Sequence, residues 1–343
     1  MRYKVRSSVS LLLAVLLVGA GVNAAHAANT PPVPGEPKCP SSVPSSAPVT
    51  PEAVNGSNID ACGLVGATVT ANGVGVVIPE RGTTVTAVGV VAEGEAPYLE
   101  VSVSAAGEVS ASTTPSPILY GKLMPDGSVV ALTPQEASVG ALAYSRCTDW
   151  SYSLLAGNWR PSTLYLNSSE RRPSNITKAT FESITISSLN VWKNGTNSCG
   201  LSRALNVPGS ISYGNWTYDA NISSTNTCTT ADGLNVIDFG GLTGGTLGLT
   251  CTWYTGSGVP VQADVRIDTS DRSWVTTTTG CSGASYDLRS VMTHELGHVL
   301  GLDHAAENGG SDLTMSPNIT NCNASARTLG AGDLTGIYVK HGA

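Results

Sequence analysis

Three of the chain's five histidines lie in one short stretch with the sequence T-H-E-L-G-H-V-L-G-L-D-H. His294 and His298 are four residues apart, so on an α-helix their imidazoles lie on one face and can bind the same metal ion. Glu295 lies about 100° around such a helix from His294, close to the ion but outside the row of ligands. We therefore predict a helix over residues 288–301 that carries two metal ligands and a neighbouring carboxylate.

His304 lies six residues beyond His298 and can reach the same ion only if the helix ends between them. On a continuous helix it would lie about 9 Å further along the axis and about 240° around it. Gly301 supplies the break, because glycine readily takes the left-handed conformation that ends helices. Three neutral imidazoles and a water molecule make a tetrahedral zinc site with one open position. We predict that the three histidines bind one zinc ion and that Glu295 is the general base that takes a proton from the zinc-activated water.

A purely structural role for the histidines is the alternative interpretation. The other two histidines, His26 and His341, lie near the two ends of the chain. A structural reason for placing the remaining three around a helix-ending glycine is hard to find, so we favour the metal site.

The N-terminus has the pattern of an export signal. Arg2, Lys4 and Arg6 precede an apolar run over residues 11–22, and a small-x-small cleavage pattern ends at Ala27. We predict a signal peptide over residues 1–27 and a secreted, extracellular protein. An uncleaved membrane anchor is the alternative, but the run is too short for a hydrocarbon layer of about 30 Å, so we expect no stable membrane insertion after cleavage.

Charge and cysteine content restrict the partners and the compartment. The net charge is −7 and no basic run occurs outside the extreme N-terminus, so we expect no nucleic-acid partner. The eight cysteines form no C-x-x-C pair, and in an exported chain they favour disulfides over a cysteine-based zinc site. We predict the pairs Cys39–Cys62, Cys147–Cys322, Cys199–Cys228 and Cys251–Cys281.

Composition divides the mature chain into three parts. Residues 28–55 are rich in proline and serine and predict an extended tether. Residues 56–140 alternate apolar and small polar residues between glycines, which predicts a small all-β module that fits a pro-region, a binding module or a spacer equally. Residues 144–343 mix the two periodicities and predict an α+β domain. In it we expect strands at 163–167, 237–239, 246–254 and 261–267, and helices at 178–192, 288–301 and 334–340.

The histidine stretch resembles the metzincin signature H-E-x-x-H-x-x-G-x-x-H, which a Met-turn follows. Met315, in Leu-Thr-Met-Ser-Pro, lies where that turn is expected. Within the metzincins, the chain resembles the matrixins through Gly301-Leu-Asp-His304, Met315-Ser-Pro317 and the closing segment 329–338. Trp192 and the strand that begins at Ala263 also fit. The resemblance covers residues from about 144 to the C-terminus.

The resemblance implies a zinc-dependent endopeptidase with a metzincin-type catalytic domain. Its expected parts are a twisted mixed sheet, an active-site helix, the Met-turn and a C-terminal helix. A protein or peptide substrate should lie extended along an edge strand near residues 263–267, with residues 317–319 walling the specificity pocket. We expect a monomer. By the same analogy, Asp264, Asp268 and Asp271 are candidate calcium ligands. The alternative interpretation is that these residues form a solvated acidic loop.

The sequence departs from the family at several points. Ala305 follows the third histidine, where matrixins usually have Ser or Thr, and Ile319 replaces a common aromatic residue. The mature chain has no histidine before His294, so we expect no second, structural zinc. Animal matrixins are often kept inactive by a pro-region cysteine, but we predict that Cys39, within Pro-Lys-Cys-Pro, is not such a switch.

Two other classes of function stay open at this point. One is a secreted binding or adhesion protein with a degenerate protease domain, which the intact Glu295 disfavours. The other is a metal-dependent hydrolase of a different substrate, which the Met-turn and the matrixin-like closing segment disfavour.

Overall fold

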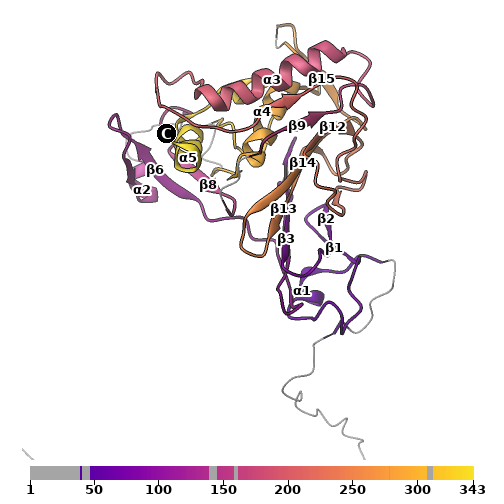
Figure 1. Cartoon of the computed structure of the whole chain (residues 1–343). Helices are drawn as coiled ribbons and strands as arrows, with labels where there is room; N and C mark the ends of the chain where they lie inside the picture. Colours follow the sequence, from indigo (N-terminus) through magenta and orange to yellow (C-terminus); the bar gives the residue numbers. More distant parts are fainter. Residues whose placement is uncertain (1–38, 41–46, 139–144, 158–160, 278, 307–311) are drawn as a thin grey trace, which may run out of the picture. The chain divides into compact units, whose positions relative to one another are not determined.

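The computed structural model describes residues 39–40, 47–138, 145–157, 161–277, 279–306 and 312–343 (Figure 1). The predicted signal peptide at 1–27 and most of the predicted tether lie outside the described residues. Residues 37–343 form one compact unit. Among the helices described, none is both long enough and apolar enough to cross a membrane.

A mixed eight-stranded sheet forms the centre of this unit, in the order β10-β9-β12-β14-β13-β3-β4-β5 (Figure 1). Strands β10, β9, β12 and β14 run parallel to one another, and β13, β3, β4 and β5 follow in antiparallel fashion. The strands are β3 (Thr83–Val91), β4 (Tyr98–Val103), β5 (Val109–Ser112), β9 (Leu164–Leu166), β10 (Ile211–Ser212), β12 (Val236–Gly240), β13 (Thr246–Thr255) and β14 (Pro260–Asp268). The mixed sheet confirms the predicted α+β class.

Strand β14 lies inside the sheet, which corrects the prediction that residues 263–267 form the substrate-binding edge. Its neighbours are β12 on one side and β13 on the other. The polar side chains of Asp264, Arg266 and Asp268, which alternate with apolar residues along β14, are all buried. The backbone N–H groups of Asn221, Val236 and Leu242 donate to the two aspartates, and Arg266 donates to Asp238.

Two helices pack together beside the sheet. The N-cap Thr177 accepts a hydrogen bond from Thr180 N, and α3 (Lys178–Asn194) ends at the left-handed Gly195. The side chain of the N-cap Asp287 accepts a hydrogen bond from Ser290 N at the start of α4 (Leu288–Val299), and α4 packs against α3. The chain closes with α5 (Ala331–His341). The shorter helices are α1 (Pro51–Val54), α2 (Pro134–Ser138) and the 3₁₀ turn η1 (Ser325–Arg327).

Three smaller sheets complete the fold, in the orders β1-β2-β11, β17-β8-β6-β7 and β15-β16. Their strands are β1 (Thr68–Ala71), β2 (Val74–Val77), β6 (Leu119–Leu123), β7 (Val129–Ala131), β8 (Ser151–Leu154), β11 (Thr227–Cys228), β15 (Ser273–Val275), β16 (Ser285–Asp287) and β17 (Leu302–Asp303). The first two sheets each combine strands from residues before and after 140.

The segment 56–140 is rich in strands, as expected, but its strands do not form a module of their own. Strand β3 pairs with β13 over the whole length of β3, and β6 pairs with β8. The end of the predicted tether is packed too: Val49 bridges to Val69, and Val54 is fully buried. The difference has a physical reason, because the apolar face of β3 is buried against a sheet that the later sequence supplies.

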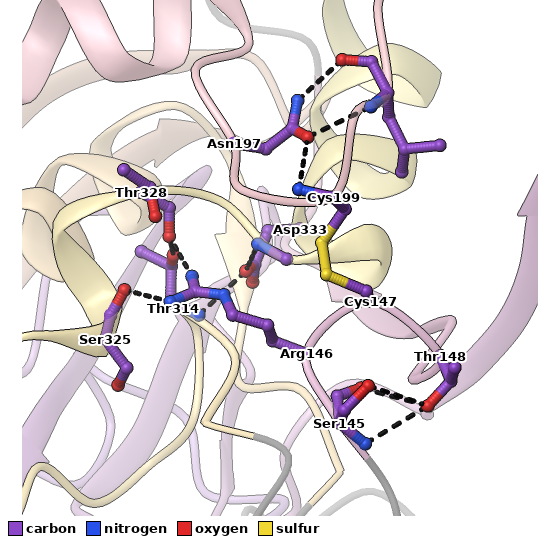
Figure 2. The surroundings of a disulfide bond; sticks show 12 residues. Ser145, Arg146, Cys147, Thr148, Asn197, Cys199, Thr314, Ser325, Thr328 and Asp333 are labelled. Carbon is purple, nitrogen blue, oxygen red and sulfur yellow. Dashed lines mark hydrogen bonds between the residues drawn. A yellow bond between two sulfur atoms is a disulfide. The ribbon is translucent and has the colours of Figure 1, made fainter.

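The disulfide between Cys39 and Cys62 was predicted, and the structure contains it. The other three predicted pairs are wrong: the structure pairs Cys147–Cys199 (Figure 2), Cys228–Cys251 and Cys281–Cys322. Strand order decides the correct set. Because β2 lies next to β11 and close to β3, Cys228 on β11 faces Cys251 on β13, and both residues are fully buried.

Candidate metal centre

Helix α4 places His294 and His298 side by side in the interior. Their Nε2 atoms lie 2.9 Å apart, and both side chains are almost completely buried. The Nδ1 atom of His294 lies 2.7 Å from the carbonyl oxygen of Thr314, and that of His298 lies 2.9 Å from the carbonyl oxygen of Leu302. A neutral imidazole that donates from Nδ1 has a lone pair on Nε2. Both lone pairs therefore point toward one place.

The turn after α4 brings His304 to the same place. The helix ends at Leu300, and Gly301 has a φ of 91°, in the left-handed region where glycine is favoured. The chain then reverses through β17. The His304 ring centroid lies 5.2 Å from that of His294 and 4.8 Å from that of His298. The ligand atoms of all three residues lie within 4.8 Å of one another.

These three residues fit a zinc ion. Burial lowers the pKa of His294 to about 4 and moves the pKa values of His298 and His304 well below their usual range. The rings are therefore neutral near pH 7, which is the form that binds metal. The Nε2 atom of His304 is buried without a hydrogen-bond partner. A set of three imidazole nitrogens, two of them with carbonyl partners at the other ring nitrogen, is a typical zinc donor set.

Glu295 is buried against strand β13. Its Oε2 accepts a 2.6 Å hydrogen bond from the Thr250 hydroxyl, and its Oε1 has no hydrogen-bond partner. A Cβ atom on Gly248 would lie 2.5 Å from Oε1, so only glycine allows the carboxylate to approach the strand this closely. Burial raises the pKa of Glu295 to about 8, opposed by hydrogen bonds from Thr250 and from the backbone N–H of Val90. The sequence held no signal for Thr250, because its role depends on strand pairing.

The predicted Met-turn lies directly against α4. A Cβ atom on Gly297 would lie 2.3 Å from Met315 Sδ, so the absence of a side chain at Gly297 makes room for the methionine. The carbonyl of Met315 accepts a 2.9 Å hydrogen bond from the backbone N–H of Ala305. The Met-turn thus contacts α4, which bears His294 and His298, and also holds Ala305, which follows His304. Pro317 follows, and its carbonyl accepts a hydrogen bond from the N–H of Val91.

Asp333 holds the Met-turn in place. Its carboxylate accepts hydrogen bonds from the backbone N–H groups of Thr314, Met315 and Gly330 at 2.7, 3.0 and 2.7 Å. Figure 2 shows the surroundings of this residue, where the Arg146 guanidinium donates to the carbonyls of Ser325 and Thr328. On sequence alone, Asp333 belongs to the matrixin-like closing segment and has no role of its own. Its position immediately before the helix predicted at 334–340 was the available signal, since an Asp there commonly accepts hydrogen bonds from the first backbone N–H groups of a helix.

The candidate calcium ligands have other partners. Asp264 accepts hydrogen bonds from the N–H groups of Asn221 and Val236, and Asp268 accepts them from Leu242 and Ser270. These bonds give the two carboxylates a structural role, and calcium binding stays a prediction.

Helix α4 carries two histidines and a buried glutamate, a third histidine follows a glycine turn, and a methionine turn packs against the helix. Together these features define a metzincin-type zinc-binding domain. Residues 215–342 match the family model described as Matrixin. No curated protein matches the chain. Helix α3 and strand β9 precede the matched segment, and both belong to the same hydrophobic core as α4.

Proposed function

We propose that the chain is a secreted zinc-dependent endopeptidase in which Glu295 is the general base. The observation that carries this proposal is the buried triad His294, His298 and His304, together with the buried carboxylate of Glu295 on the helix that bears the first two histidines. The matrixin match supports a metallopeptidase. The endopeptidase activity, the route of export and the natural substrate go beyond that match.

The residues divide the chemistry among them. A bound zinc ion supplies Lewis-acid polarisation of the scissile carbonyl and acidifies water. The three histidines would hold the ion, and the carbonyls of Thr314 and Leu302 fix the tautomers of His294 and His298. A carboxylate oxygen of Glu295 takes a proton from the attacking water and passes it to the nitrogen of the leaving amine. Thr250 orients that carboxylate through its hydroxyl group.

Export rests on two observations of different kinds. The N-terminal sequence has the pattern of a signal peptide. All eight cysteines are paired in four disulfides, and no described cysteine is free. Disulfides form and persist in oxidising compartments, so they are consistent with an extracellular protein.

The test is cleavage of a reduced, alkylated protein substrate, with the fragments identified by mass spectrometry. We expect cuts at internal peptide bonds that stop when a zinc chelator is added. A binding or adhesion protein would leave the substrate intact. A hydrolase of another class would also leave it intact while its metal site remained loaded, and either result would refute the proposal.

A further inference from the structure

The end of strand β3 lies between two segments that border the candidate metal centre. We call residues Val88–Ala92 the groove segment. On one side it pairs antiparallel with β13, where Ala92 N donates to the carbonyl of Gly245 at 3.2 Å. On the other side Val88 pairs with Tyr98 of β4 and Gly89 N donates to Pro97 O at 3.3 Å, and at Val91 the segment runs parallel to the chain after the Met-turn. There Val91 N donates to Pro317 O at 3.2 Å, and Ile319 N donates to Val91 O at 3.0 Å.

These contacts place one peptide bond of the groove segment beside Glu295. Val90 is the register partner of Gly248, and Gly248 is the residue against which the Glu295 carboxylate packs. The backbone N–H of Val90 interacts with that carboxylate. A base that returns a proton to the leaving amine must lie next to the nitrogen of the bond that breaks. The Gly89–Val90 bond is therefore in the position of a bond about to be cut.

The side chains on either side of this bond are constrained in opposite ways. A Cβ atom on Gly89 would lie 2.3 Å from the carbonyl oxygen of Gly248, so this position takes only glycine in the observed arrangement. The side chain of Val90 is fully buried in the same core as Met315 and Ile319. Residues 317–319, predicted to wall the specificity pocket, are hydrogen-bonded to the backbone of Val91, the next residue of the groove segment.

While the groove segment is in place, it leaves no room for an external peptide, so the wild-type protein can cut a substrate only when the segment withdraws. His294, His298 and Glu295 are at most 1% exposed. A peptide that binds as an added strand needs a free sheet edge. All nine residues of β3 pair with β13, so the edge of β13 is not free.

We propose that the groove segment occupies the peptide-binding groove as a mimic of the substrate, with Gly89 and Val90 on the two sides of the cleavage position. This inference rests on the proposed function and names its substrate class: extended peptides with glycine before the cut bond and a valine-sized aliphatic residue after it. The groove becomes available when the segment withdraws. Cys39 takes no part, because it is bonded to Cys62.

The test begins with the zinc-loaded wild-type protein and does not depend on its activity. Hydrogen exchange measured by mass spectrometry should show protected amides at Val91 and Ala92, in contrast to the exposed residues Glu93 and Glu95. The rate at which a chelator removes zinc should be limited by withdrawal of the segment. If residues 88–92 exchange as fast as residues 93–95, the proposal is wrong.

Two variants should open the groove. Gly89→Val introduces a clash with Gly248 O, and Val91→Pro removes the N–H that bonds to Pro317 O. Thr84→Val is the matched control, because Thr84 lies in the same strand, is half-buried and is remote from Glu295. The probe is a fluorescent peptide with the sequence of residues 84–92, Thr-Val-Thr-Ala-Val-Gly-Val-Val-Ala. A scrambled peptide reports nonspecific binding.

We expect both opening variants to bind the probe about tenfold or more tightly than wild type and to lose zinc correspondingly faster, whereas Thr84→Val behaves as wild type. Unchanged protection of α3 and α4 amides shows that each variant is folded. Equal probe binding by wild type and a folded opening variant would overturn the proposal.

If the variants bind the probe but never cut an unfolded protein, the proposed function fails and the groove assignment stands. If unfolded protein is cut but the probe binds wild type and the variants equally, the groove assignment fails and the proposed function stands.

Discussion

At the scale of single residues, the histidine stretch predicted where the metal ligands would meet, but not what surrounds them. The spacing of His294 and His298 and the break at Gly301 follow from helix geometry, and the structure has both features. The partners of Glu295, namely Thr250 and Gly248, come from a strand more than forty residues away. Such contacts depend on the register of strand pairing, which local sequence does not encode.

Replacing Glu295 separates metal binding from proton transfer. We expect Glu295→Ala to keep its zinc and to lose nearly all peptidase activity, because the three ligands remain while the general base is gone. Zinc content by metal analysis and cleavage of an unfolded protein are measured on the same sample. Turnover near that of wild type would remove Glu295 from the mechanism.

Asp264 gives the fold a pH dependence that can be measured away from the metal centre. Burial raises its pKa from 3.8 to about 7, against hydrogen bonds from Asn221, Val236 and Gln262. Between pH 4 and 7 the folded state therefore binds more protons at this site than the unfolded state, so its contribution to stability falls as pH rises, by up to about 1.4 kcal/mol per pH unit.

The comparison with Asp264→Asn isolates this contribution. Asparagine does not titrate, and it turns an amide group toward backbone donors, so we expect a lower melting temperature at acid pH. The difference between the two proteins should shrink as pH rises from 4 to 7. A difference that stays constant over this range would show that Asp264 does not titrate there.

At the scale of elements, the helices α3, α4 and α5 and the strands β9, β12, β13 and β14 were predictable because each carries a strong local pattern, whereas the two- and three-residue strands β10, β11, β15, β16 and β17 were not predicted. Helix α4 was expected over 288–301 and runs from Leu288 to Val299, and β13 was expected over 246–254 and runs from Thr246 to Thr255. The place of β14 in the sheet was not predictable. Its polar residues are buried in hydrogen bonds and in the Arg266–Asp238 ion pair, so alternation did not distinguish an edge from the interior.

The contact between α5 and the Met-turn provides a test of support by one element for another. Asp333→Ala leaves three backbone N–H groups without an acceptor, and we expect a loss of roughly 2–4 kcal/mol in the free energy of unfolding. Because Thr314 also holds His294 through its carbonyl, zinc affinity should fall by about 10–100-fold. Denaturant unfolding and zinc titration measure the two effects. Asp60→Ala is the control, since the Asp60 side chain is 58% exposed.

At the scale of the whole molecule, the boundary predicted near residue 140 does not divide the structure. Residues 37–343 form one compact unit, and strands from both sides of that position share sheets. Composition changes there, and this change suggested a separate module. Pairing between β3 and β13 joins residues about 160 positions apart, which no local pattern could predict. The same long-range contacts explain why three of four disulfide assignments were wrong.

The disulfide Cys228–Cys251 links β11 to β13 across the core that includes the N-terminal strands. Replacing both cysteines with alanine should lower the free energy of unfolding by roughly 3 kcal/mol, the value expected for a closed loop of this length. Denaturant titration of the double variant and of wild type measures the difference. Equal midpoints would contradict the structural role of this bond.

The central claim is that one zinc ion held by His294, His298 and His304 makes this chain a peptidase. The most direct measurement is a zinc titration of the chelator-treated protein, wild type and Gly89→Val in parallel, with bound zinc and cleavage of an unfolded protein followed together. We expect cleavage by Gly89→Val to rise in proportion to bound zinc and to reach its maximum at one ion per chain, with wild type following the same stoichiometry at a lower rate. Full cleavage by protein that holds no zinc, or none by protein fully loaded with it, would contradict the account.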